Sequence, residues 1–302
     1  MRNRRAHPCR STGVATALLL LVTIQPLTEA SAGPFIEEFE LKTLTTEPGA
    51  IELQSQNAWA WDQPSRRTAV NEDGEFIADE NSVFRERYAL EVEVGLAERL
   101  KMRVGIEGEN ERVDDPTSAA NADDFAGLEV NEIGAEVIAV LLERPAEGFG
   151  LGLVAEIEGP FDQEEPNHLT LGTILEYQVG AWLFAAVPMA VRAFGGETEP
   201  GEPRDEKWDF AYAVQLQRTL NQQWTIALEG YGTVERIGSS GHRSEASEMF
   251  GDAEQHRLGP VAYFSHEWGD DPMELTIGIG LLEGLSSETA DHTLKLSIDL
   301  DF

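Results

Sequence analysis

The stretch Leu294–Phe302 (LKLSIDLDF) decides the fold, because apolar and polar side chains alternate along it without a break. A period of two residues is typical of a β-strand, whose successive side chains point to opposite faces, whereas a helix repeats every 3.6 residues or so. This stretch is therefore a strand with one apolar and one charged face. The apolar face carries Leu294, Leu296, Ile298, Leu300 and Phe302.

The same alternation recurs upstream in segments of about ten residues, the length of a membrane-spanning strand. The connections between them alternate in length after the first strand, long then short, which is typical of outer-membrane barrels. The sequence thus predicts an all-β fold, a transmembrane antiparallel up-and-down β-barrel of 12 strands. The predicted strands are 50–61, 88–96, 100–107, 128–143, 149–158, 169–178, 182–194, 209–216, 224–235, 256–268, 273–281 and 293–302.

The polar face of these strands decides which side meets lipid. It is rich in Glu and Gly, and it cannot form a dry core because buried unpaired carboxylates cost several kcal/mol each. The apolar face is therefore the one withdrawn from water, and in a single closed sheet it can only face outward, against lipid. Closure also satisfies every backbone hydrogen bond inside the membrane. We expect the charged face to line a wet lumen.

Composition excludes several other classes of protein. The 302 residues carry 55 Asp and Glu against 22 Lys and Arg, a net charge of -33, so a nucleic-acid partner is not expected. A single Cys excludes a disulfide scaffold and a Cys-based zinc site. Beyond the first thirty residues, no apolar run approaches the roughly 18 residues of a membrane helix.

The N-terminus is typical of an export signal. Several arginines precede the apolar stretch 14–24, and an Ala-Ser-Ala site follows, so residues 1–32 are predicted to be a signal peptide removed after Ala32. Residues 33–49 are predicted to be a short periplasmic segment that tucks into the barrel or caps its base. The barrel itself is predicted over 50–302, and the cysteine-free chain that remains suits a Gram-negative cell envelope.

Strand parity predicts which ionisable residues line the lumen. Their carboxylates would attract cations and repel anions, which favours a passive channel for small cationic or neutral solutes. The alternative is that the charges pair across strands into a non-conducting, structural or surface-interaction barrel. The lumen-lining candidates are Glu91, Glu93, Lys101, Arg103, Glu107, Glu156, Glu158, Glu176, Arg192, Glu229, Arg257, Glu274 and Lys295.

Two further predictions concern residues that face the lumen. In 182–194 the residues Ala185, Val187 and Met189 are assigned to the apolar outer face, which turns Arg192 inward. Inward glycines, among them Gly95 and Gly150, are expected to permit bending of the barrel or to open space.

An enzyme is the less favoured alternative, because some 12-stranded outer-membrane barrels are lipid hydrolases. Alternation places Ser265 and Glu267 on one face and His266 on the other, so they cannot form a catalytic relay. The sequence also has no G-x-S-x-G nucleophile motif. No catalytic, cofactor-binding or metal-binding residue is predicted.

Three stretches carry a resemblance to a known family: Glu52-Leu53 to Trp59-Ala60-Trp61, Arg257-Leu258-Gly259-Pro260 and Leu294–Phe302. On these, the chain resembles proteobacterial outer-membrane barrels of the "MetA-pathway of phenol degradation" family, loosely related in architecture to fatty-acid and toluene transporters. The resemblance covers residues 33–302 and implies a location in the cell outer membrane, with lipid and lipopolysaccharide as neighbours. The terminal strand ending in Phe302 also looks like the signal recognised by the outer-membrane assembly machinery.

Overall fold

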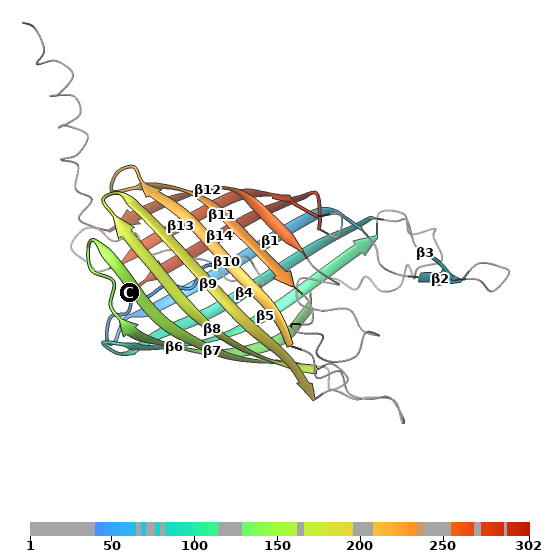
Figure 1. The fold of residues 1–302 in the computed structure, drawn as a ribbon, viewed down its shortest axis with the longest axis horizontal. Helices are drawn as coiled ribbons and strands as arrows, with labels where there is room; N and C mark the ends of the chain where they lie inside the picture. The colour runs from blue at the N-terminus through green and yellow to red at the C-terminus, as the bar shows by residue number, and fades with distance from the viewer. Residues whose placement is uncertain are drawn as a thin grey trace, which may run out of the picture.

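The computed structural model describes residues 40–64, 68–70, 76–78, 82–113, 129–161, 166–195, 208–234, 237, 255–268, 273–286 and 289–302. Twelve of its strands form one closed antiparallel barrel, as the alternation predicted (Figure 1). The barrel strands are β1 Ile51–Pro64, β4 Ser82–Ala97, β5 Leu100–Val113, β6 Glu129–Leu142, β7 Gly148–Pro160, β8 Pro166–Val179, β9 Trp182–Gly195, β10 Trp208–Thr219, β11 Trp224–Val234, β12 His256–Glu267, β13 Glu274–Gly284 and β14 His292–Asp301.

Each strand pairs with its neighbours in sequence, and β1 closes the barrel by pairing with both β4 and β14. The connection between β1 and β4 contains a further small sheet, β2 (Thr68–Val70) with β3 (Phe76–Ala78). None of the described residues forms a helix long and apolar enough to cross a bilayer.

The start of β1 and the end of β14 lie at the same end of the barrel. There the Phe302 amide donates a hydrogen bond to the Ile51 carbonyl at 2.9 Å. The short connections 98–99, 143–147, 180–181 and 220–223 lie at this same end, which we call the terminal end. One of these turns uses Gly180 at φ +56°, a left-handed conformation that other residues adopt only at a cost. The opposite end, which receives the long connections, is called the distal end.

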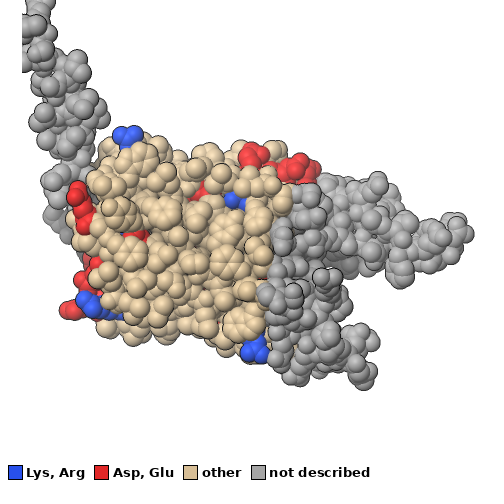
Figure 2. All heavy atoms as spheres, in the orientation of Figure 1, with Lys and Arg blue, Asp and Glu red and all other residues tan. Residues whose placement is uncertain are grey.

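The outer surface of the barrel is apolar around its middle. Figure 2 shows a mostly uncharged face, with Lys, Arg, Asp and Glu gathered towards its two ends. The side chains at this surface belong to the outward parity of each strand and remain exposed in the isolated chain. They include Leu90, Val92, Leu153, Ile157, Leu171, Phe184, Leu216, Ile226, Leu228, Ile279, Leu281 and Ile298. Such a belt suits lipid tails, so the fold is that of a transmembrane outer-membrane barrel.

Strand β9 presents the opposite face to the one predicted. Ala185, Val187 and Met189 are buried inside the barrel, and Arg192 lies on the outer face. There Arg192 stands directly across from Trp208, with its guanidinium 5.6 Å from the ring centroid. Both faces of β9 are apolar, so its alternation carries no information about orientation, and pairing with β8 and β10 decides it. The prediction that Arg192 lines the lumen was therefore wrong.

Candidate functional site

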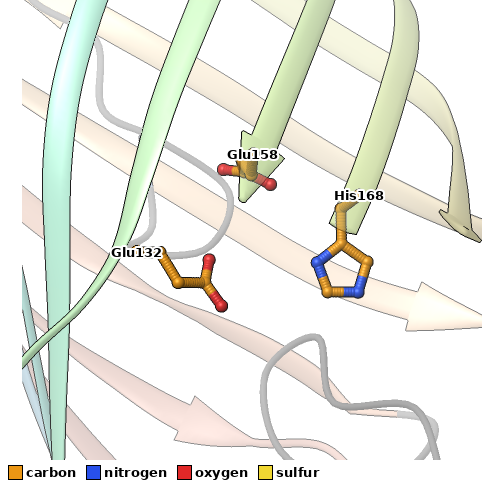
Figure 3. Close-up of side chains that lie close together, drawn as sticks. All are labelled: Glu132, Glu158 and His168. Carbon is orange, nitrogen blue, oxygen red and sulfur yellow. The ribbon is translucent and has the colours of Figure 1, made fainter. Parts of the chain in front are cut away.

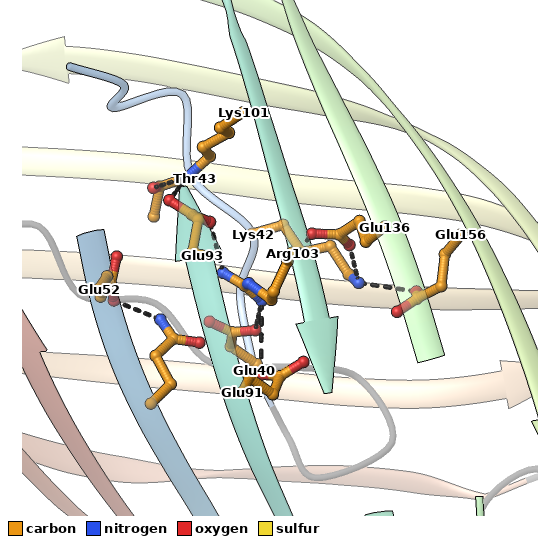
Figure 4. A network of polar contacts seen from close by, with 11 residues as sticks. Glu40, Lys42, Thr43, Glu52, Glu91, Glu93, Lys101, Arg103, Glu136 and Glu156 are labelled. Carbon is orange, nitrogen blue, oxygen red and sulfur yellow. Dashed lines mark hydrogen bonds and ion pairs between the residues drawn. The ribbon is translucent and has the colours of Figure 1, made fainter. Parts of the chain in front are cut away.

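Residues 40–50, called here the lumen segment, run inside the barrel from the terminal end (Figure 4). Two backbone hydrogen bonds fix the entry point, from Gly49 N to Gly95 O at 2.7 Å and from Gly95 N to Ala50 O at 3.0 Å. A Cβ built on Gly95 would lie 1.9 Å from the carbonyl oxygen of Glu47, so only glycine admits the segment here. The lack of a side chain at Gly95 thus allows the backbone of the lumen segment to lie close to that of β4.

Arg103 on β5 holds one part of the lumen segment. Its guanidinium pairs with Glu40 of the segment at 2.6 Å and with Glu93 of β4 at 3.0 Å. Glu91 and Glu136 lie slightly farther away, at 3.7 and 3.9 Å. The Arg103 side chain is only 3 % exposed and that of Glu40 is fully buried. Because buried charges are tolerated only when paired, this contact ties the segment to the wall.

Lys42 makes the second ionic contact between the lumen segment and the wall. Its ammonium pairs with Glu156 of β7 at 2.8 Å and with Glu136 of β6. Lys101 adds a pair with Glu93 at 3.0 Å. The cluster around the segment, which we call the segment cluster, therefore contains five carboxylates and three cations. Its members are Glu40, Lys42, Glu91, Glu93, Lys101, Arg103, Glu136 and Glu156.

An apolar contact completes the anchoring. Leu44 lies against β7 at two glycines, where a Cβ on Gly150 or Gly152 would each approach a Leu44 methyl to 2.5 Å. The Leu44 amide also donates to Glu176 at 2.9 Å, and Arg144 pairs with the same carboxylate at 2.6 Å. Because these two glycines of β7 have no side chains, they leave a slot that Leu44 fills.

A second buried cluster stands on the inner wall of β10, β11, β12 and β14, and we call it the wall cluster. Lys295 pairs with Glu229 at 2.6 Å, and both side chains are fully buried. The Glu229 carboxylate also accepts hydrogen bonds from Gln215 at 2.7 Å, from Tyr231 at 2.5 Å and from Tyr263. The two tyrosine rings lie 5.6 Å from the Lys295 ammonium. One carboxylate and one cation are thus matched within the wall itself.

A cavity of about 380 Å³ opens at the terminal end between the lumen segment and the barrel rim. It is lined by residues 44–48 of the segment and by Glu98, Glu143, Arg144 and Glu176 of the wall and turns. The mouth of the barrel on this side is therefore open as far as Leu44.

The structure places the other predicted lumen residues on the inner wall. Those that are buried there are Glu91, Glu93, Lys101, Arg103, Glu107, Glu156, Glu158, Glu176, Glu229, Arg257 and Lys295. Glu274, at the terminal end of β13, is half-buried and shares the inward parity of Thr276. Arg257 donates to Thr293 at 3.1 Å.

Several residues that belong to these clusters were not predicted. Glu40 and Lys42 fall in a segment placed outside the barrel strands, and Tyr231 and Tyr263 were not among the candidates because they carry no charge. At the distal end, the ligand atoms of Glu132, Glu158 and His168 lie within 4.8 Å of one another (Figure 3). The inward parity of Glu158 could have indicated one member of this group, whereas its pairing with His168 is set by the β7–β8 ladder.

The Ser265, His266 and Glu267 stretch behaves as alternation predicts. The Ser265 hydroxyl is 2.8 Å from that of Thr276, while the His266 ring stands edge-on to Trp268 with centroids 5.2 Å apart. The two side chains thus engage different neighbours.

Comparisons with known proteins support the fold. No family model matches the sequence, and no curated protein is significantly similar to it. Among solved structures, the chain is similar to an outer membrane channel of Pseudomonas putida F1, with 13 % identity and a TM-score of 0.58 over 85 % of this chain and 97 % of that one. The likeness shows the outer-membrane barrel fold, while the resemblance to the MetA-pathway family stays a prediction.

Two other solved barrels are less similar. The transport unit of the autotransporter AIDA-I of Escherichia coli has 10 % identity and a TM-score of 0.48, over 87 % of this chain and 93 % of that one. The KdgM porin, solved with disordered oligogalacturonate, has 8 % identity and a TM-score of 0.42, over 84 % of this chain and 98 % of that one.

Proposed function

We propose that the chain is a diffusion channel or small-molecule transporter of the outer membrane, whose lumen is narrowed by the lumen segment. The observation that carries the proposal is the segment itself, a stretch of chain held inside the barrel by side-chain ion pairs at Glu40 and Lys42. A wall that only had to fill its own interior could pair its charges strand to strand, as the wall cluster does. Contacts to a separate segment can be broken without opening the barrel.

The charges of the described inner wall support a preference for small cationic or neutral solutes. Carboxylates outnumber cations there, and an excess of fixed negative charge concentrates cations and repels anions. The inward carboxylates are Glu52, Glu91, Glu93, Glu107, Glu132, Glu136, Glu156, Glu158, Glu176, Asp209, Glu229, Glu274, Asp299 and Asp301, and the inward cations are Arg85, Arg87, Lys101, Arg103, Arg257 and Lys295.

The partners we propose follow from the outer surface and the last strand. The apolar belt is suited to membrane lipid, and the distal end to contact with lipopolysaccharide. The apolar residues of β14 and Phe302 would be recognised by the outer-membrane assembly machinery, and signal-peptide removal after Ala32 would precede that step. The role is non-catalytic.

Conductance in planar bilayers tests the proposal. We expect the chain without residues 1–32 to give small, cation-selective currents, and the Lys42→Met variant to give currents several-fold larger because the segment loses two carboxylate partners. Lys42→Arg, which keeps the charge, is the matched control and should resemble the unaltered chain. Silence of all three proteins would refute the channel and favour a structural barrel, whereas anion selectivity would refute the electrostatic part alone.

A further inference from the structure

Three side chains with metal-ligating atoms converge near the distal end of the barrel interior. They come from three adjacent strands: Glu132 from β6, Glu158 from β7 and His168 from β8. One carboxylate oxygen of each Glu and one ring nitrogen of the His lie within 4.8 Å of one another. In Figure 3 the three side chains project from their strands into the same region of the lumen.

The backbone register makes this convergence a built feature. Glu158 and His168 are directly opposite in the β7–β8 ladder, so their side chains leave the sheet on the same face. On the other side of β7, Glu158 pairs with Gly134 of β6. Glu132 is two residues from Gly134 on the same strand, so its side chain also faces inward. None of the three side chains lies on a loop, and rigid strands hold a ligand geometry more tightly than loops do.

Gly134 lies beside the group and shows which side chains border it. A Cβ placed there would lie 3.5 Å from Glu158 Cγ, 4.0 Å from its Oε1 and 3.8 Å from Oε1 of Glu107. Glu107 stands directly opposite Glu132 in the β5–β6 ladder. A third carboxylate therefore borders the same space.

We propose that Glu132, Glu158 and His168 form a binding site for a divalent transition-metal ion of the Zn²⁺ class in the lumen. Imidazole nitrogen and carboxylate oxygen bind Zn²⁺ at 2.0 to 2.2 Å or thereabouts, and open zinc sites commonly use three protein ligands plus water or a further group. The three ligand atoms lie within 4.8 Å of one another, close enough to share one ion. The nitrogen ligand disfavours Ca²⁺ and Mg²⁺, which prefer oxygen alone.

The metal also has a consequence for the lumen. The site lies on the inner wall, so a bound divalent cation would neutralise part of the negative charge that a permeating cation meets. This consequence rests on the proposed channel function, whereas binding itself does not. The test therefore measures binding directly, so that failure of the site and failure of the channel remain distinguishable.

Zinc binding to the purified barrel in detergent provides the test. The chain carries no polyhistidine tag, and millimolar Ca²⁺ is present to occupy sites that use carboxylates alone. Calorimetry should show one Zn²⁺ per chain, with the affinity reduced at least tenfold in His168→Ala and in Glu158→Gln. His266→Ala, which removes a ring that stands edge-on to Trp268, is the matched control and should bind as the unaltered chain does.

A spectroscopic arm identifies the ligands. Co²⁺ substituted at the site should give visible absorption bands typical of a low-coordinate ion with nitrogen and oxygen ligands, and the bands should disappear in His168→Ala. Heat-modifiable migration on gels verifies that each variant is a folded barrel. Failure of folded, unaltered chain to bind Zn²⁺ in excess Ca²⁺, or binding that is unchanged in both His168→Ala and Glu158→Gln, would overturn the proposal.

Discussion

The two buried ionic clusters of this barrel differ in how they are completed. The wall cluster draws every member from the strands β10 to β14, and it matches one carboxylate, Glu229, with one cation, Lys295. The segment cluster is completed by Glu40 and Lys42, which belong to a stretch of chain that is not part of the sheet. The contacts of the segment cluster can therefore be lost without moving any strand, whereas those of the wall cluster are set by the strand pairing itself.

The difference distinguishes ion pairs that are present whenever the barrel is folded from ion pairs that also require the lumen segment to be in place. Buried ions cost several kcal/mol each to desolvate, and the cost is recovered only by close partners. In the wall cluster those partners are fixed by strand pairing. In the segment cluster, departure of residues 40–50 would remove two charged partners and at the same time admit water, which lowers the cost of the charges left behind.

The largest expected effect is on the wall cluster. Lys295→Met leaves the Glu229 carboxylate buried without the cation that pairs with it, and the structure gives it no other cation within the described part of the chain. We expect a loss of about 3–5 kcal/mol in the free energy of unfolding, the cost typical of breaking a buried pair. Denaturant unfolding of the barrel in lipid vesicles measures this loss.

The double variant Lys295→Met with Glu229→Gln is the control for that prediction. A neutral amide keeps hydrogen bonds with Tyr231 and Gln215 without the uncompensated charge, so most of the lost stability should return. A double variant as unstable as Lys295→Met would show that packing, and not charge pairing, is what Lys295 supplies.

A smaller effect is expected where the lumen segment meets β7. Gly152→Ala would place a methyl group 2.5 Å from Leu44 Cδ2 and should weaken the segment's binding by about 1–2 kcal/mol, as overpacking does. Lys42 is the sole Lys or Arg in residues 33–50, so trypsin reports release of the segment by cutting after it. Cleavage should quicken roughly tenfold for a loss of that size.

Leu44→Ala completes the comparison as a double-mutant cycle. Removal of the Leu44 methyls makes room for the new methyl, so Gly152→Ala should cost little more once Leu44 is already Ala. Equal costs of Gly152→Ala in both backgrounds would mean that the slot seen at β7 does not hold the segment.

The barrel was predictable because its pattern is local. Leu294 to Phe302 alternates at every position, and most strands keep enough of that alternation to fix both the strand and its outward face. Strand β9 shows the limit, because Phe184 and Val187 are both large and apolar yet lie on opposite faces. Only the ladder to β8 and β10 orients such a strand, and ladders join residues far apart in the sequence.

The interior was harder to predict for the same reason. Parity places Glu156 inward, but it does not show that its partner is Lys42, 114 residues earlier. Likewise, Gly150 was predicted to face inward, while the Leu44 side chain that fills the space beside it comes from a stretch without strand alternation. Contacts between a non-repetitive segment and the wall leave no periodic trace in the sequence.

The smallest expected effect concerns an exposed ion pair at the terminal end, which isolates the contribution of burial. Arg99 and Glu143 are 2.8 Å apart, as close as Lys42 and Glu156, but each side chain is 59 % exposed. Water already solvates both charges, so Arg99→Gln should change the free energy of unfolding by less than about 0.5 kcal/mol, and 1 M salt should abolish the difference. A loss comparable to that of Lys295→Met would mean that distance alone, not burial, ranks the ion pairs of this barrel.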